Sequence, residues 1–279
     1  MEFFKTETNI DFMAIKSKAL LFSGFLFAVS LIAILINGLN LGLDFTGGTQ
    51  YEFKLNEYTT IDQIRSQLAN TGFDDALVQS AGGQKQALIR TGIQPDQSPA
   101  EQKQQIQQAL KTLAELDKNE YIGPQVGREL LFNGIAAVVI SIVFTMIYIM
   151  LRFEYRFAIS AALALVHDPI VIIGIFSALQ IEFNLIGLAA LLTVLGYSLN
   201  DTIVVYDRIR ENIKKDHTSS IATIVNHAIN QTLSRTIITS GLTLMVVLAL
   251  YIWGGDTLEG FSLALIIGIV IGTYSSIYI

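Results

Sequence analysis

Six long apolar segments follow one another along this chain, separated by shorter polar stretches. Each is close to the roughly 20 residues that a helix needs to cross a bilayer. We therefore predict spanning helices over Ala19–Asn37, Leu130–Met150, Phe157–Leu179, Phe183–Tyr206, Ile237–Trp253 and Leu258–Ile279. The predicted organisation is an N-terminal segment over 1–18, a first span over 19–37, an external domain over 40–128 and five further spans within 130–279.

The region between the first two spans has the pattern of a small α+β domain. Apolar residues alternate in its first strand-like run, which holds Tyr51, Phe53 and Leu55. A run with helical spacing follows, formed by Ile61, Ile64 and Leu68. Two more strand-like runs, 76–80 and 86–90, flank Gly82-Gly83, which predicts a hairpin.

A second helix is predicted over Ser98–Asp117, with an apolar face formed by Ile106, Leu110, Leu113 and Leu116. A last strand over Glu120–Val126 leads back to the second span. The resulting order, βαββαβ, is that of a ferredoxin-like domain. That fold hosts many functions, so by itself it indicates none of them.

Composition agrees with a membrane protein and excludes several other classes. Hydrophobic residues make up 52% of the chain and charged residues 15%, whereas a soluble domain has roughly 25% charged residues. The chain has no cysteine, and its three histidines, His167, His217 and His227, lack the spacing of a zinc site. Nothing in the sequence indicates a cofactor, a metal or an enzymatic reaction, and the net charge of -6 gives no sign of nucleic-acid binding.

The distribution of lysine and arginine predicts the orientation. The two short outer turns, 180–182 and 254–257, contain neither residue. The predicted inner segments hold Lys5, Lys16, Lys18, Arg152, Arg156, Arg208, Arg210, Lys214, Lys215 and Arg235. By the positive-inside rule, both termini lie in the cytoplasm and the domain over 40–128 lies outside.

Asp201 interrupts an otherwise uncharged apolar run. An acid at membrane depth costs about 2.5 to 3.5 kcal/mol on insertion scales, so it usually serves a function. Counting about 1.5 Å per residue from Phe183 places Asp201 roughly 27 Å along its helix, in the inner part of the bilayer. Arg235 begins the next predicted span at a similar depth, and we predict that the two side chains pair.

This pairing has two interpretations. Hydrocarbon favours the protonated form of a carboxylate and a guanidinium favours the ionised form, so the competition suits an Asp that loads and releases a proton. The alternative is a static ion pair that only fixes helix packing. The neighbour Asn200 points about 100° around the helix, and both a packing and a transport role are open for it.

Asp168 lies near the middle of the third predicted span. It could belong to a proton relay or serve only in structure. Pro169 follows it, removes a backbone donor and can bend the helix. We interpret the adjacent His167 as a buried histidine whose hydrogen bonds are satisfied.

Two glycine-bearing turns connect the spans to the external domain. Asp44, Thr46, Gly47 and Gly48 follow the first span, and the turn from Gly123 to Gly127 precedes the second. Glycine permits positive φ or a close approach of two backbones. We predict a structural hinge at these turns, which is compatible with mechanical coupling between membrane and domain.

Four motifs resemble one known family over essentially the whole chain, and they occur here in the order LDFTGG (43–48), GPQVG (123–127), GYSLNDTIVVYDRIREN (196–212) and NQTLSRT (230–236). Together they resemble the SecF subunits of the bacterial Sec protein-export machinery. This resemblance implies a six-helix half of the resistance-nodulation-division type with one external ferredoxin-like domain, in the inner (cytoplasmic) membrane.

The resemblance also implies partners and a mechanism. The expected partners are SecD, the SecYEG translocon, translocating preproteins and membrane lipid, with YajC and YidC as further candidates. The proton-motive force would assist translocation, with Asp201 and Arg235 as candidate proton-path residues. The alternatives are a proton-coupled exporter of small molecules or lipids from the same superfamily, and a non-transporting assembly scaffold. A single small external domain leaves little room for a substrate cleft, and a scaffold should tolerate Asp201→Asn.

Overall fold

The computed structural model describes residues 8–81, 86–92, 97–153 and 155–279. Their contacts divide the chain into two compact units, one of them Leu41–Ile135 and the other the residues up to Asn40 together with Ala136–Ile279. The predicted Gly82-Gly83 turn and Lys5 lie outside the described residues.

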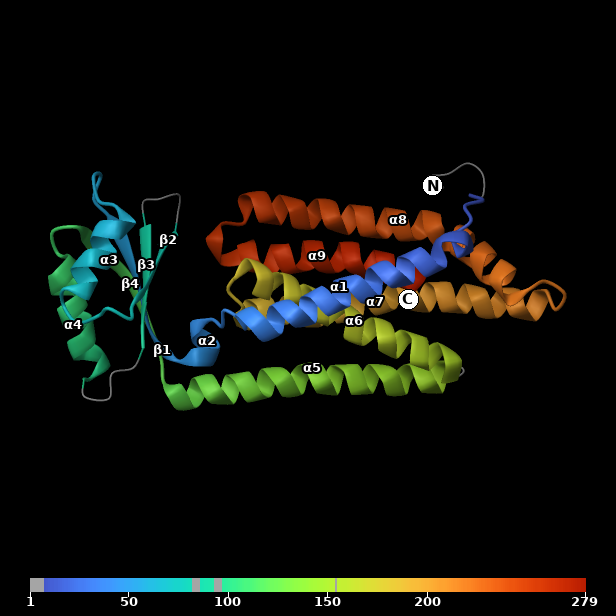
Figure 1. Cartoon of the computed structure of the whole chain (residues 1–279), viewed down its shortest axis with the longest axis horizontal. Coiled ribbons are helices and arrows are strands. Elements are labelled where there is room, and N and C mark those ends of the chain that lie inside the picture. Colours follow the sequence, from blue (N-terminus) through green and yellow to red (C-terminus); the bar gives the residue numbers. More distant parts are fainter. Residues whose placement is uncertain (1–7, 82–85, 93–96, 154) are drawn as a thin grey trace. The chain divides into compact units, whose positions relative to one another are not determined.

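The smaller unit is an antiparallel sheet with the helices α3 and α4 on one face (Figure 1). Its elements are α2 (Leu43–Thr46), β1 (Gly48–Leu55), α3 (Ile61–Ala69), β2 (Leu77–Ala81), β3 (Gln86–Thr91), α4 (Pro99–Leu110) and β4 (Ala114–Ile122). The strands lie in the order β2-β3-β1-β4, and every neighbouring pair is antiparallel. This arrangement confirms the predicted βαββαβ ferredoxin-like fold.

Buried and less buried residues alternate along β1 and β3, and capping residues start the two helices α3 and α4. Thr60 and Ser98 each start a helix with a capping box, which satisfies backbone donors of the first turn. The buried core lies between the sheet and the two helices α3 and α4. Its fully buried large side chains are Tyr51, Phe53, Ile64, Leu68, Ile89, Ile106 and Leu110.

The predicted helix over Ser98–Asp117 is wrong at its C-terminal end. Helix α4 ends at Leu110, and Leu116 lies on β4 opposite Phe53 of β1. The apolar spacing continues past the true end because the strand also turns apolar residues towards the core. The residues after Ala114 form a strand and not a helix because β4 makes a ladder of hydrogen bonds with β1 from Gly48 to Leu55. The predicted last strand, Glu120–Val126, ends at Ile122 because Pro124 starts the next helix.

The larger unit is helical. Six helices of the described chain are long and apolar enough to cross a membrane, as predicted. They are α1 (Lys16–Asn37), α5 (Pro124–Arg152), α6 (Tyr155–Leu179), α7 (Leu185–Lys215), α8 (Ile221–Trp253) and α9 (Asp256–Tyr278). Helix α8 begins well before the predicted Ile237, since Ser220 caps its first turn by accepting a hydrogen bond from the Thr223 amide.

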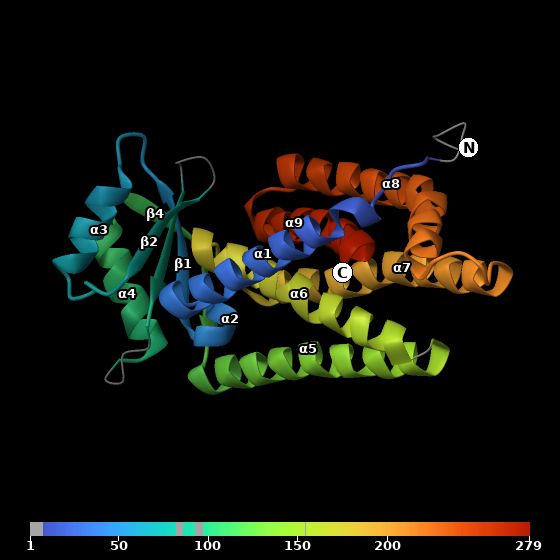
Figure 2. The same cartoon turned by 45° about the vertical axis from the view of Figure 1, so that its right-hand side comes forward.

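Close helix packing brings the later spans together. Helix α9 packs against both α7 and α8, and α1 packs against α6 (Figures 1 and 2). Small residues permit these approaches: a Cβ atom on Gly272 of α9 would lie 3.0 Å from the Cβ of Ser198 on α7. Such contacts fix the rotation of each helix, and so they decide which side chains face the interior.

Candidate carboxylate site between the membrane helices

Two buried carboxylates lie among the membrane helices of the larger unit. Asp168 of α6 is 1% exposed and Asp201 of α7 is 8% exposed. On α7, Ser198 and Asp201 are three residues apart and therefore share the buried face of the helix. Hydroxyl groups from α7, α8 and α9 surround the two acids.

Asp201 is held by two hydroxyl groups. Thr236 of α8 donates to its Oδ1 at 2.7 Å, and Ser276 of α9 donates to its Oδ2 at 2.5 Å. These donors support the ionised carboxylate without bringing a positive charge. A hydroxyl can also accept a hydrogen bond, so the same two groups can serve a protonated Asp201 after a simple rotation.

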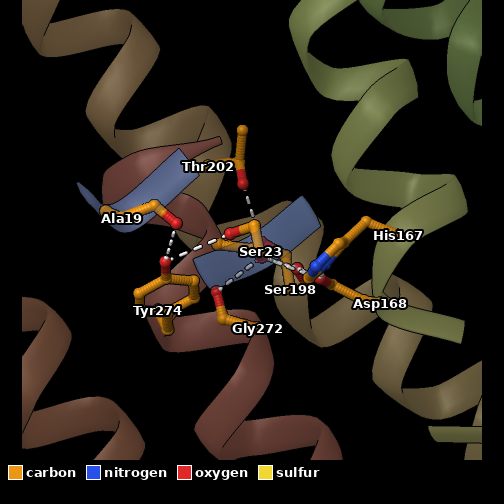
Figure 3. Close-up of polar contacts among 9 residues, drawn as sticks. Ala19, Ser23, His167, Asp168, Ser198, Thr202, Gly272 and Tyr274 are labelled. Carbon is orange, nitrogen blue, oxygen red and sulfur yellow. Dashed lines mark hydrogen bonds and ion pairs between the residues drawn. The ribbon is translucent and has the colours of Figure 1, made fainter. Parts of the chain in front are cut away.

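Asp168 has three partners. Ser198 of α7 donates to its Oδ2 at 2.6 Å (Figure 3), and Ser275 of α9 donates to the same oxygen at 2.8 Å. Its Oδ1 lies 2.9 Å from Nδ1 of His167, the preceding residue of α6. Because Asp168 is almost fully buried, these bonds replace the water that a carboxylate otherwise needs.

Two helices connect the acids into one site. On α9, the consecutive residues Ser275 and Ser276 bond to Asp168 and Asp201 respectively. On α7, Ser198 bonds to Asp168 while Asp201 is the second acid itself. A change of charge at either carboxylate therefore alters a contact of both α7 and α9.

The expected contact between Arg235 and Asp201 is not made among the described residues. Arg235 is exposed on α8, and its neighbour Thr236 contacts Asp201 instead. Consecutive residues of a helix point about 100° apart, so only one of the two can face α7. Arg235 nevertheless lies at the level of Asp201. Its assignment to a proton path stays a prediction.

Asn200 and His167 complete the predicted residues of the membrane unit. Asn200 is exposed on α7, facing away from the buried side on which Asp201 lies, and its role stays a prediction. His167 differs from the interpretation as a fully satisfied histidine: its Nε2 is buried and has no hydrogen-bond partner among the described residues.

A cavity of about 670 Å³ reaches the site within the larger unit. Thr202, Ser275 and Ser276 line it next to the carboxylates. Basic side chains also line it, namely Arg156, Arg210 and Lys214. Because these basic residues lie in the segments that the positive-inside rule assigns to the cytoplasm, the cavity runs between the carboxylates and the predicted inner end of the helices.

The glycine turns of the smaller unit form one packed junction. Gly47 and Gly48 have φ values of +69° and +126°, which favour glycine. A Cβ atom on Gly127 would lie 2.9 Å from the Gly47 amide nitrogen, and one on Gly48 would lie 2.7 Å from the Thr91 carbonyl oxygen. A Cβ on Gly123 would meet only the Tyr121 hydroxyl, at 3.8 Å.

The other residues of the predicted hinge belong to the same junction. Asp44 and Thr46 form part of α2, and the Thr46 hydroxyl donates to the Gly42 carbonyl oxygen at 3.2 Å. The chain divides between Asn40 and Leu41 and between Ile135 and Ala136. Both glycine turns thus lie inside the smaller unit, away from its boundaries, because backbone contacts join them to each other.

Four residues of the site escaped the sequence analysis. They are all hydroxyl side chains that bond to a carboxylate, namely Ser198, Thr236, Ser275 and Ser276. Two signals could have indicated them. Ser198 is three residues before Asp201, and Ser275-Ser276 is a polar pair within an apolar span.

Two family models match this chain. The model for the C-terminal part of protein export membrane proteins SecD/SecF matches residues 102–279, and the SecD/SecF GG motif matches residues 32–57. "Protein translocase subunit SecF" of Vibrio alginolyticus is 46% identical, with 99% of this chain and 89% of that protein covered. The protein of the same description from Calditerrivibrio nitroreducens is 44% identical, with 99% and 93% covered.

Solved structures match as well. The crystal structure of SecDF from Thermus thermophilus, described as a translocon-associated membrane protein, has 35% sequence identity and a TM-score of 0.90. SecDF in a super-membrane-facing form also has 35% identity, with a TM-score of 0.70. Each match covers 99% of this chain and 38% of the solved chain. This chain thus spans well under half the length of those proteins.

Proposed function

The chain belongs to the SecD/SecF family of bacterial protein-export membrane proteins, and from that premise we propose that it is the SecF-type half of a proton-driven export motor. It is a multi-pass inner-membrane subunit of the Sec translocation system and not an enzyme. The proposal adds the energy source, the partner half and the residues that carry the proton.

The hydrogen bonds that Asp201 accepts from two hydroxyl groups, those of Thr236 and Ser276, are the observation that carries this proposal. A buried carboxylate with a fixed cation would be locked in its ionised form. Among the described residues, Asp201 contacts two neutral hydroxyls and no lysine or arginine. It can therefore take up a proton without breaking an ion pair. The cavity beside Ser276 gives water a place from which that proton can arrive or into which it can leave.

A partner half follows from the exposed polar groups at the same level. Arg235 on α8 and Asn200 on α7 are both exposed near Asp201. A guanidinium facing hydrocarbon is costly, so such a residue usually faces protein or water instead. The matched solved chains are longer than this one, and the family supplies SecD as the subunit that would cover these faces.

Both termini lie in the cytoplasm and the smaller unit lies on the outer side, as the distribution of basic residues predicts. The complete assembly acts on preproteins at the SecYEG translocon. YajC, YidC and membrane lipid are further candidate partners through the family resemblance.

Motion of the smaller unit would convert proton transfer into work on the preprotein. The packed glycine junction supports movement of this unit as one block.

Export into inverted membrane vesicles tests the proposal, with two asparagine variants of α7 compared. Asp201→Asn keeps the volume of the side chain but cannot exchange a proton, so the part of export that depends on the proton gradient should be lost. Asp207→Asn is the matched control, because Asp207 is half-exposed at the end of the span and lies 3.4 Å from Arg152.

The control should retain gradient-dependent export. Both variants should assemble with the partner subunit to the same extent as the parent protein. Equal gradient-dependent export by Asp201→Asn and the parent would refute the proton-carrier role and favour a scaffold.

A further inference from the structure

His167 has one ring nitrogen that is bonded and one that is not. Its side chain is buried among the membrane helices and is 7% exposed. Nδ1 lies 2.9 Å from Oδ1 of Asp168, and the ring stacks on Phe27 of α1 at 6.2 Å with an interplanar angle of 12°. Nε2 is buried without a hydrogen-bond partner among the described residues.

The bond to Asp168 determines what Nε2 can do. Ser198 and Ser275 both donate to Oδ2 of Asp168. When Asp168 is ionised, Nδ1 of His167 carries the proton of the bond to Oδ1. Nε2 of the neutral ring is then a bare acceptor. A buried acceptor without a donor costs free energy. Protonation turns Nε2 into an N–H donor, whose hydrogen bond a water molecule that reaches the ring can accept.

Charge favours the same event. With Asp168 ionised and His167 neutral, the pair carries one uncompensated negative charge inside the membrane. Protonation of the ring converts it into a hydrogen-bonded ion pair with no net charge. In a medium of low polarity, an isolated buried charge is more costly than a paired one.

The groups around the pair do not compete for this proton. The helices packed against α6 here are α1, α7 and α9. They present Phe27, Ser198 and Ser275 to the pair. Tyr274 of α9 instead donates to the Ala19 carbonyl oxygen of α1 (Figure 3). No lysine or arginine contacts Asp168 or His167 among the described residues, and the other acid of the site is Asp201.

We propose that His167 and Asp168 form a second proton-binding site, distinct from Asp201. A proton adds to Nε2 of His167 to give the imidazolium, Asp168 stays ionised, and no other bond forms or breaks. The two proton sites are coupled, since α9 contacts one through Ser275 and the other through Ser276. The use of this coupling in export rests on the proposed role of Asp201, whereas proton binding by His167 does not.

Nuclear magnetic resonance of the full chain in liposomes tests the proposal directly. The chain has three histidines, so labelling with ¹⁵N-histidine gives three imidazoles. The variants His167→Asn, His217→Gln and His227→Gln assign them by loss of signal. His217 and His227 are exposed and serve as internal controls.

As the pH falls, His167 should change from the ring protonated only at Nδ1 to the ring protonated at both nitrogens. In Asp201→Asn this change should occur at a lower pH than in the parent protein, because a neutral amide no longer favours the imidazolium. In Asp207→Asn it should stay where it is in the parent protein.

Two results would overturn parts of the proposal. If His167 stayed neutral while His217 and His227 titrated, it would not be a proton-binding site. If its titration were the same in Asp201→Asn as in the parent, the two sites would not be coupled. Neither measurement depends on export, so normal export by Asp201→Asn would refute the proposed function and leave these results interpretable.

Discussion

Ser276 donates a 2.5 Å hydrogen bond to Asp201, and the residue before it, Ser275, donates to Asp168. One turn of α9 thus connects two carboxylates that belong to different helices. An acid that gains a proton no longer needs the same hydroxyl donor, so its contact with α9 changes. Through this relationship, a single proton can alter the packing of α6, α7 and α9.

Removal of the Ser276 hydroxyl should weaken proton-driven export. A hydrogen bond to a charged group contributes about 1.5 to 3 kcal/mol, and its loss should disfavour ionised Asp201. We expect Ser276→Ala to reduce the gradient-dependent export rate by about tenfold, which corresponds to about 1.4 kcal/mol. Vesicle export assays measure this rate.

Ser262→Ala is the matched control for this change. Ser262 is a buried serine of the same helix, but its hydroxyl donates to the Leu258 carbonyl oxygen of α9 itself. It should retain the parent rate. Similar rates for the two variants would show that the bond to Asp201 has no part in export.

Arg235→Met should separate stability from function. Arg235 is exposed and makes no ion pair among the described residues, so the thermal stability of the isolated chain should change by less than about 0.5 kcal/mol. Export should be lost once the partner subunit is present, because the guanidinium would then face that subunit. Thermal unfolding and vesicle export measure the two effects.

Arg208→Met serves as the comparison, since Arg208 pairs at the surface with Glu211 at 2.9 Å. It should be nearly neutral in both assays. A large loss of stability in Arg235→Met alone would show that Arg235 supports the fold of this chain and not its contact with a partner.

A methyl group on Gly127 should disrupt the junction of the smaller unit. The added Cβ would lie 2.9 Å from the Gly47 amide nitrogen and 3.2 Å from the Phe45 carbonyl oxygen, and backbone atoms cannot turn away as a side chain can. Overpacking of this kind costs roughly 1 to 3 kcal/mol. Gly123→Ala has room for its methyl group and should be tolerated, so equal unfolding temperatures for the two variants would contradict the close packing.

The loop between α7 and α8 should depend on pH through Asp216. Hydrogen bonds from Ser219 and Thr218 hold the pKa of the Asp216 carboxyl well below its usual range. The ionised form thus stabilises the loop at any pH above about 3.9, the usual value of an unfolded Asp, and this contribution disappears as the pH falls through the lower folded value.

Asp216→Asn should therefore speed amide hydrogen exchange at Thr218 and Ser219 near neutral pH, since it removes an ionised acceptor of both amides. The difference from the parent protein should shrink in strong acid. A difference that stayed constant down to the lowest pH would show that the charge of Asp216 does not stabilise the loop.

Hydrophobic pattern predicted the six spans and the order βαββαβ because burial of apolar faces dominates both. Asp201 and Asp168 were recognisable because acids are rare in apolar runs. Hydroxyls give no such signal: Thr239, Thr243 and Ser262 also lie in spans, and each donates to a carbonyl of its own helix. Only the packing of α9 against α7 and α8 distinguishes Ser276 from these.

The expected Arg235–Asp201 pair shows a second limit of the sequence. Counting residues along two helices gives the level of each side chain in the membrane. It does not give the rotation of the helices, which depends on contacts such as that of Gly272 with Ser198. The level was therefore predictable, whereas the choice between Arg235 and Thr236 as the neighbour of Asp201 required the structure.

Infrared spectroscopy of the carboxyl C=O stretch in the full chain, reconstituted in lipid, tests most directly whether Asp201 exchanges a proton. We expect a band of a buried protonated carboxyl that grows as the pH falls and is missing from Asp201→Asn but present in Asp207→Asn. If Asp201→Asn showed the same titrating bands as the parent protein, Asp201 would keep one protonation state throughout and would not carry a proton.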